Sequence, residues 1–124
     1  MKYVSRSAIG GMALLAILLA ANPAPAEETE EVFKFYCAQC HGLQGKGDGP
    51  NVGKDFPVSP RNFTNAEEMN KLTDADIKNV ILDGGPSVSK SPMMPPWSKT
   101  LTEADADGLI KYLRVLCDCP GKQG

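Results

Sequence analysis

Apolar residues recur with the spacing of an amphipathic helix in three stretches of the chain. These stretches are residues 29–39, 73–83 and 102–116. Each begins at a threonine, whose side-chain oxygen can accept a free N–H group of the first helical turn. A shorter helix is expected at about residues 65–71, and no run of strictly alternating residues predicts a β-strand. The pattern therefore predicts an all-α domain of about four helices.

Two segments rich in glycine and proline separate the predicted helices. Residues 42–61 contain five glycines and three prolines, and residues 84–100 begin with a glycine pair. Glycine and proline at this density indicate turns and loops. The second segment contains Met93-Met94-Pro95-Pro96, in which two thioethers stand beside residues that fix the backbone φ angle. Such a rigid pair is unusual for methionine, which ordinarily fills irregular apolar gaps.

The first 26 residues have the layout of a secretory signal peptide. Lys2 and Arg6 make a basic start, residues 8–21 are uncharged and mostly apolar, and residues 24–26 form an A-x-A cleavage motif. The apolar run is short for a membrane span, which takes about 20 residues. We expect residues 27–124 to form the mature domain in the periplasm, with an uncleaved membrane anchor as the alternative.

The composition of the mature part limits its functions. Removing Lys2 and Arg6 from the 13 basic residues leaves 11 against 15 acidic ones, a formal charge of −4. Such a domain is a poor binder of nucleic acid, whose affinity comes from neutralised phosphates, and is steered toward basic partner surfaces. The chain has only 1 Trp, 4 Phe and 3 Tyr. A disulfide, metal or cofactor is therefore expected to contribute to the core.

Residues 37–41 read Cys-Ala-Gln-Cys-His, the C-x-x-C-H attachment site of a c-type haem. The two thiols can each add to a vinyl group of the porphyrin, and the next residue can place an imidazole under the iron. His41 is the single histidine, so the sixth ligand must be Met, Cys, water or nothing. Three alternatives stay open: a thioredoxin-like dithiol, which lacks its usual βαβ pattern here, a zinc site that adds Cys117 and Cys119, and a plain disulfide framework.

Further segments around this motif resemble the class I c-type cytochromes. A loop like HGxxGxGDGP, a PRNFT segment, an MPPW segment and an LIKYL run occur in this order, at residues 41–50, 60–64, 94–97 and 109–113. Phe33 stands four residues before Cys37, where the family usually has an aromatic residue. Thr29 departs from the family, because a small glycine there often lets the terminal helices cross closely. The resemblance implies the class I cytochrome c fold, with long loops around one covalently bound haem.

The resemblance also implies how the haem would be held. Cys37 and Cys40 would form the covalent thioethers, and His41 would be the proximal ligand of the iron. Met94 would be the distal ligand, because it directly precedes the Pro-Pro-Trp sequence as the family's methionine does. Met93 is the fallback ligand.

Other residues would form the surroundings of the haem. Pro50 would offer its carbonyl to the second ring nitrogen of His41, and Trp97 would pack near the haem edge. Phe33 and Tyr112 would lie where the first and last helices cross. Two interpretations of Arg61 stay open: a partner for a haem propionate, or an ordinary surface charge.

A histidine–methionine pair closes the coordination of the iron and favours the ferrous form. This predicts a carrier of single electrons rather than an enzyme, with membrane or periplasmic oxidoreductases as partners. It predicts no nucleic acid and no small-molecule substrate, and membrane contact only if the signal peptide is uncleaved. The alternatives are an electron-relay subunit of a larger dehydrogenase or reductase complex, and a gas-binding or gas-sensing haem domain with a labile sixth ligand.

The C-x-C pair near the C-terminus has no counterpart in the resemblance. Cys117 and Cys119 could form a disulfide, pair with another chain or stay reduced. Cys117 lies four residues after Leu113, so it is expected to face the core.

Overall fold

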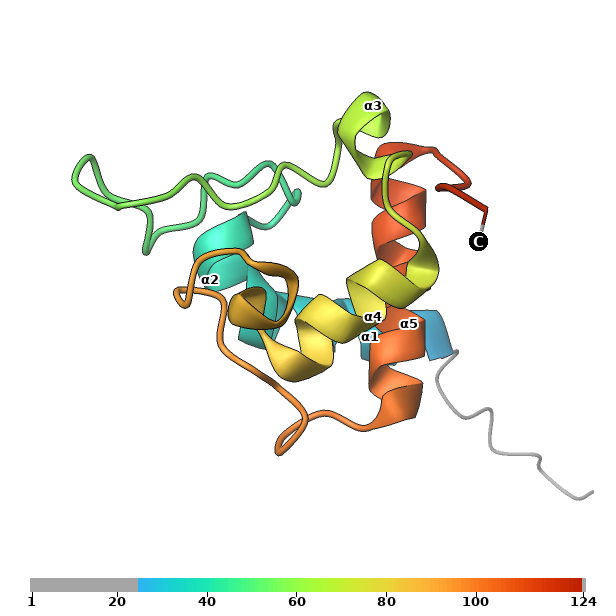
Figure 1. The fold of residues 1–124 in the computed structure, drawn as a ribbon. Coiled ribbons are helices and arrows are strands. Elements are labelled where there is room, and N and C mark those ends of the chain that lie inside the picture. The colour runs from blue at the N-terminus through green and yellow to red at the C-terminus, as the bar shows by residue number, and fades with distance from the viewer. Residues whose placement is uncertain (1–24, 124) are drawn as a thin grey trace, which may run out of the picture.

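A computed structural model describes residues 25–123, and within this range the chain is helical with no β-strand. The elements are α1 (Pro25–Val32), the π-helical turn η1 (Phe33–Cys37), α2 (Ala38–His41), α3 (Ala66–Met69), α4 (Asp74–Asp83), the 3-10 turn η2 (Gly85–Val88) and α5 (Glu103–Cys117). Long loops of residues 42–65 and 89–102 join them on one side of the molecule (Figure 1). The predicted all-α fold with long loops is confirmed.

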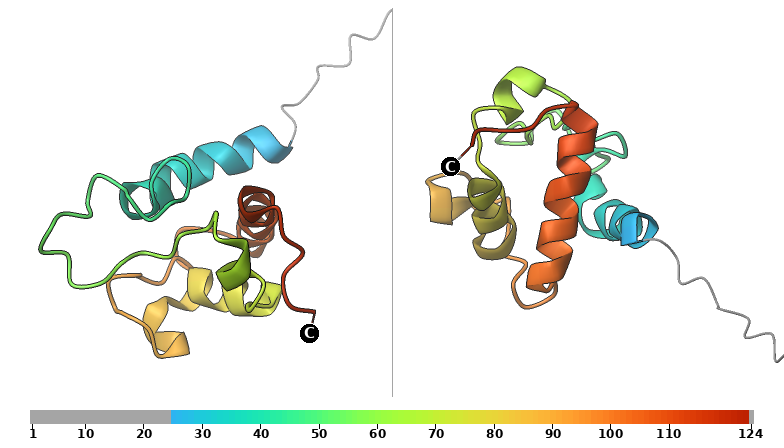
Figure 2. Two further views of the ribbon diagram at one scale, coloured as in Figure 1. Left: turned by 90° about the horizontal axis from the view of Figure 1, so that it is seen from above. Right: turned by 90° about the vertical axis from the view of Figure 1, so that its right-hand side faces the viewer.

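The first helical stretch is longer than predicted. α1, η1 and α2 follow one another without a break, and Figure 2 shows them as one rod. Thr29 lies inside this rod, with Glu27 and Glu28 in the first turn, so the prediction of Thr29 as an N-cap is wrong. The π-helical turn widens the helix directly before α2 and changes which face the residues of α2 present. The spacing of apolar residues contained no signal of this turn.

The later helices begin where their threonines predict. Thr73 accepts the N–H of Asp76, and the Asp76 carboxylate accepts the N–H of Thr73 at 2.8 Å, which completes a capping box at the start of α4. Thr102 and Asp105 form the same arrangement at the start of α5. Asn65 caps the short helix α3. These local hydrogen bonds satisfy N–H groups that the first turn of a helix leaves free.

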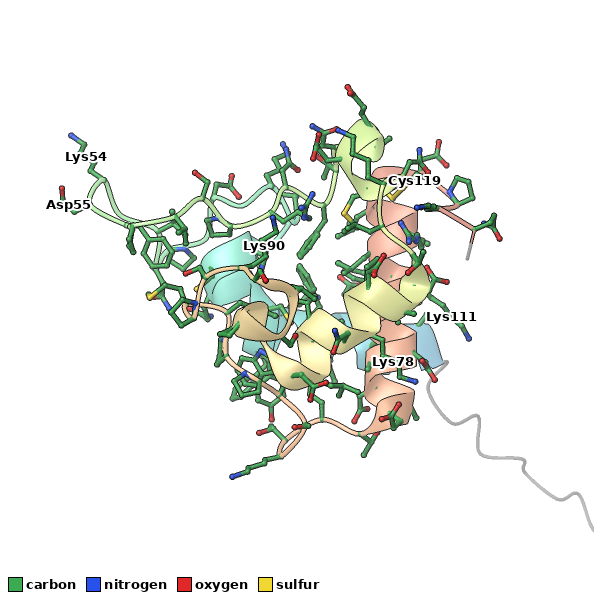
Figure 3. All side chains as sticks on the ribbon, viewed as in Figure 1. Lys54, Asp55, Lys78, Lys90, Lys111 and Cys119 are labelled. Atoms are coloured by element: carbon green, nitrogen blue, oxygen red, sulfur yellow. A yellow bond between two sulfur atoms is a disulfide. The ribbon has the colours of Figure 1, made fainter. Side chains whose placement is uncertain are left out.

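α5 crosses the rod of α1 to α2 and also packs against α4 (Figure 2). Phe33 and Leu109 are almost fully buried at the centre of the core. The rings of Phe33 and Tyr112 lie 5.0 Å apart between their centroids, so the predicted aromatic contact at this crossing is confirmed. Lys78 of α4 reaches Glu103 at 2.6 Å and Asp107 at 2.9 Å on α5, on the outer side of the helix pair (Figure 3).

The close approach at the crossing depends on a glycine of the last helix. A Cβ at Gly108 of α5 would lie 2.7 Å from the hydroxyl oxygen of Thr29 and 3.5 Å from its methyl group. The small residue therefore stands on α5, and the larger threonine stands on α1. This exchange explains how the chain tolerates Thr29 at a position where the resembling family often has glycine.

A double-mutant cycle between Thr29 and Gly108 tests this contact. In the Thr29→Gly background, Gly108→Ala should raise the free energy of unfolding, because alanine stabilises a helix interior by roughly 1 kcal/mol over glycine. With Thr29 present, the added methyl group meets the threonine and this gain should disappear. Chemical denaturation should give a coupling energy of about 1 kcal/mol. Additive effects of the two substitutions would show that the two positions do not touch.

The C-terminal end of α5 is closed by a disulfide. Cys117 and Cys119 are bonded and buried, and Asp118 between them takes a left-handed conformation with φ of 47°. The N–H of Cys119 donates to the carbonyl of Arg114 at 3.2 Å, which satisfies an end carbonyl of the helix. The expected burial of Cys117 is confirmed, and the question of the redox state is answered by a bond within the chain.

Arg114 joins α5 to the segment between α3 and α4. Its Nη1 donates to the carbonyl of Met69 at 2.9 Å, its Nη2 donates to the carbonyl of Leu72 at 2.8 Å, and its Nε donates to Asp74 at 2.9 Å. The tail covers the guanidinium, since a Cβ at Gly121 would lie 2.2 Å from its Cζ. Only 12% of the Arg114 side chain is exposed. The planar guanidinium of Arg114 thus joins α5 to the end of α3, to the turn that follows and to the start of α4.

Replacing Arg114 should destabilise the domain strongly. Arg114→Lys keeps the charge but loses the fork of donors, so two backbone carbonyls lose their partners. We expect the free energy of unfolding to fall by about 2–4 kcal/mol, measured by denaturant titration. Lys111→Ala, on the exposed side of the same helix, is the matched control and should change it by less than about 0.5 kcal/mol. Equal losses in both variants would contradict this role.

The predicted signal peptide, residues 1–26, lies outside the described residues except for Pro25 and Ala26 at the start of α1. It stays a prediction, as does the boundary of the mature domain. None of the helices between residues 25 and 123 is long and apolar enough to cross a membrane.

Candidate haem-binding site

A cavity of about 510 Å³ lies between α2, α4 and the two long loops. Its wall is mostly apolar, and its size is within the range of small-molecule and cofactor sites. It brings together nearly all residues that the sequence singled out, although they come from distant parts of the chain. Those that line it are Cys37, Cys40, His41, Arg61, Met93, Met94 and Trp97. Pro50 does not line it.

The two cysteines of the C-x-x-C-H motif are free thiols at the cavity wall. Cys37 ends η1 and Cys40 lies in α2, and both are half-buried. Burial raises the pKa of Cys37 to about 12, so its thiol is neutral at physiological pH. Cys117 and Cys119 are bonded to each other, and no cluster that could hold a metal ion occurs in residues 25–123. The four-cysteine zinc site considered from the sequence is therefore excluded.

The imidazole of His41 is held by a backbone carbonyl. Its Nδ1 lies 3.1 Å from the carbonyl oxygen of Arg61, while Nε2 has no hydrogen bond to any of the described residues. Burial lowers the pKa of His41 below its usual value, and the bond to the Arg61 carbonyl opposes this only in part. In the neutral tautomer that donates from Nδ1, the lone pair on Nε2 is available to a metal.

The prediction that Pro50 supplies this carbonyl is wrong. The N–H groups of Gly49 and Asn51 donate to the carbonyls of Cys40 and Gln39, so the loop passes the end of α2 with Pro50 exposed to solvent. A Cβ at Gly49 would lie 2.4 Å from the Gln39 carbonyl oxygen, so only glycine allows this approach.

The acceptor comes instead from the segment of residues 60–64, ten residues farther along the loop. Gly47, with φ of 81°, lets this segment come close, since a Cβ there would lie 2.5 Å from the carbonyl oxygen of Pro60. The PRNFT motif of this segment was recognised from the sequence. The role of the Arg61 backbone as an acceptor for His41 was not predicted.

Phe63 is a site residue that the sequence analysis did not identify. Its ring stacks on the imidazole of His41, with 4.4 Å between the centroids and 23° between the planes. The ring of Phe33, in the core, meets the ring of Phe63 edge-on, with 6.3 Å between the centroids. The one available signal was the position of Phe63 within the PRNFT motif.

Arg61 and Trp97 both lie at the wall of the cavity. The Arg61 guanidinium pairs with Glu68 at 3.6 Å, and both side chains are partly exposed. The indole of Trp97 meets the ring of Tyr36 at 5.4 Å in a T-shaped contact, and its backbone N–H donates to the carbonyl of Ile81. Both interpretations of Arg61 fit this arrangement, since its charge borders the cavity and also has a partner in the protein.

The two methionines both line the cavity but differ in their contacts with the end of α4 and in their exposure. The Met94 carbonyl accepts the N–H of Gly85 at 2.8 Å, and a Cβ at Gly84 would lie 2.9 Å from the same oxygen. Met94 is half-buried, whereas 47% of Met93 is exposed. The glycine pair at the end of α4 therefore clamps Met94 in place, which favours it over Met93 as the ligand.

The family model described as "Cytochrome C oxidase, cbb3-type, subunit III" matches residues 24–113. The chain belongs to this family of c-type cytochromes. It is 32% identical over 109 residues to cytochrome c55X of Paracoccus denitrificans, a match that covers 82% of this chain and 91% of that protein. It is 28% identical over 102 residues to cytochrome c-553 of Helicobacter pylori, with 82% and 92% covered.

Two solved structures are similar to this cytochrome. One is titled "KustC0563 c-type cytochrome", with a TM-score of 0.55, 27% identity, and coverage of 71% of this chain and 95% of that one. The other belongs to the Kuenenia stuttgartiensis reducing HAO-like protein complex Kustc0457/Kustc0458, with a TM-score of 0.57 and 33% identity. That match covers 73% of this chain but 41% of the longer one. The class I cytochrome c fold and the electron-transfer function of the family follow from these likenesses.

A c-type cytochrome carries haem c bound through thioethers, and the residues at this cavity fit that group. Two free thiols, an imidazole with an available Nε2 and two thioethers line one apolar cavity. The chain has one histidine, in its one C-x-x-C-H motif, which accommodates a single haem. The bound haem supplies an iron that cycles between the ferrous and ferric states.

The choice between the methionines can be tested in the ferric protein with haem attached. Met94→Ala should remove the weak far-red charge-transfer band of a methionine–iron bond and lower the reduction potential. Met93→Ala should keep the band, because its sulfur is not the ligand. The covalent haem content of each variant is the control. Loss of the band in Met93→Ala alone would assign the other sulfur, and rapid CO or NO binding by the unmodified protein would indicate a labile sixth ligand.

Proposed function

We propose that this cytochrome is a periplasmic carrier that shuttles single electrons between redox enzymes, with His41 and Met94 as axial ligands. The observation that carries the proposal is the cavity itself, where an imidazole and a clamped thioether are brought together with two free thiols. Two protein ligands leave no coordination position for a substrate. The protein therefore acts by docking to a partner near the haem edge, not by transforming a molecule at the iron.

The relatives support a small carrier. The matches to cytochrome c55X and cytochrome c-553 extend over 91% and 92% of those proteins. The predicted signal peptide supports a periplasmic location, and so does the disulfide of Cys117 and Cys119, because such bonds persist in oxidising compartments. The formal charge of −4 on residues 27–124 would steer the carrier toward basic surfaces of its partners.

The backbone contacts that fix the positions of His41 and Met94 suit an electron carrier. An iron that changes its charge at each transfer needs ligands that move little between the two states. Arg61 fixes His41 from one loop, and Gly84 and Gly85 hold the backbone of Met94 from the end of α4. Because both ligands are held by backbone contacts, little reorganisation accompanies each electron.

A relay subunit of a larger complex is the second candidate. It is favoured by the likeness to part of a longer chain in the HAO-like complex, where this chain spans 41% of the matched one. The matching family is described as subunit III of an oxidase, which supports the same candidate. The domain would then keep the same ligands but stay fixed to one partner.

Fractionation of cells that express the full chain with a C-terminal tag distinguishes the two candidates. For a carrier, we expect the haem-containing protein in the periplasmic fraction, free of any partner in fixed ratio, and able to exchange electrons with oxidoreductases added in solution. Recovery with a larger enzyme at constant stoichiometry would overturn the carrier and support the relay. The variant Cys37→Ser/Cys40→Ser is the matched control, because it should lack covalent haem and exchange no electrons.

A further inference from the structure

The stacked pair of Phe63 and His41 is not needed to bind a haem. Two thiols attach the group, and Nε2 of His41 is available as a ligand whether or not a ring covers the imidazole. Nevertheless the two rings lie nearly parallel, with 23° between their planes and 4.4 Å between their centroids. Parallel aromatic pairs at this distance contribute attraction beyond the burial of their area.

The position of Phe63 is fixed from three sides. Its backbone N–H donates to the carbonyl of Gly45 at 2.6 Å. A Cβ at Gly45 would lie 3.3 Å from Phe63 and 2.9 Å from Leu116 of α5, so this glycine allows the loop to approach the ring. Phe33, which is 1% exposed, meets the ring edge-on. The ring is therefore wedged between the helical core and the imidazole.

One short segment makes two different contacts with His41. The carbonyl of Arg61 holds the edge of the imidazole at Nδ1, and the ring of Phe63 covers a face. Asn62, between Arg61 and Phe63, stiffens the segment. Its side-chain oxygen accepts two hydrogen bonds from Thr64, one from the backbone N–H at 2.9 Å and one from the hydroxyl at 2.8 Å. A hydrogen bond to one nitrogen fixes that edge but allows the ring to tilt about it. A stacked ring removes this freedom.

We propose that Phe63 is a positioning residue for the His41 ligand, which fixes the plane of the imidazole, keeps water from the covered face and thereby raises the reduction potential of the haem. The inference rests on the proposed role of His41 as an iron ligand. The physical reason is that water near the ligand stabilises the more charged ferric state, whereas an apolar ring favours the ferrous state.

The test compares Phe63→Leu and Phe63→Tyr in the full chain with haem attached. Leucine keeps an apolar side chain but removes the planar ring, and tyrosine keeps the ring. For Phe63→Leu we expect a lower reduction potential, equivalent to a roughly 2- to 10-fold fall in the ratio of ferrous to ferric protein at a fixed potential. Phe63→Tyr should stay close to the unmodified protein. Phe35→Leu is the matched control, because Phe35 is 73% exposed and its ring meets that of Tyr36 and not the imidazole of His41.

Two further measurements keep the outcomes distinct. In the ferrous protein, proton NMR should show cross-relaxation between the rings of Phe63 and His41, a result that needs no variant. Its absence, or an unchanged potential in Phe63→Leu, would overturn the inference. An equal fall of the potential in Phe35→Leu would do the same. An unmodified protein without covalent haem, measured as its pyridine haemochrome, would instead overturn the proposed function itself.

Discussion

Backbone hydrogen bonds hold the loop of residues 42–65 against the C-terminal end of α2, and the geometry of the site depends on them. The carbonyls of Gln39, Cys40 and His41 accept N–H groups from Asn51, Gly49 and Gly47. These are carbonyls that the end of a helix leaves without partners inside the helix. Because glycines of the loop lie almost on the helix backbone, the chain can return beside His41. The next part of the loop then brings the carbonyl of Arg61 and the ring of Phe63 to the imidazole.

The fold places an apolar cavity beside its buried helical core. The cavity of about 510 Å³ has a mostly apolar wall, which suits the porphyrin of a haem. α5 keeps this arrangement together. It crosses α1 through the contact of Gly108 with Thr29, and Arg114 ties it to the segment between α3 and α4. Met69 and Leu72, whose carbonyls bind Arg114, also line the cavity.

Much of the fold and of the haem site could be predicted from the sequence, because the features that indicate them lie close together in the chain. The capping boxes at Thr73 and Thr102 involve residues three positions apart, and they lie where the sequence predicts. The thiols and imidazole of residues 37–41 are neighbours in the chain, so any helix there presents them together. The contact of Phe33 with Tyr112 was expected from the resemblance to class I cytochromes, in which the terminal helices cross at this point.

The predictions that were wrong or missing concern contacts between segments far apart in the sequence. Pro50 is the first proline after the motif, but the path of the loop exposes it and brings Arg61 to the imidazole. Thr29 is a good cap by composition, but the helix already begins at Pro25, so Thr29 lies inside it, opposite Gly108 of α5. The sequence by itself determined the all-helical pattern, the capped starts of α4 and α5, the C-x-x-C-H residues and the adjacent pair of methionine sulfurs, because each depends on residues near one another. Only the tertiary structure decided which carbonyl and which ring hold His41, because that depends on where glycines let one backbone approach another.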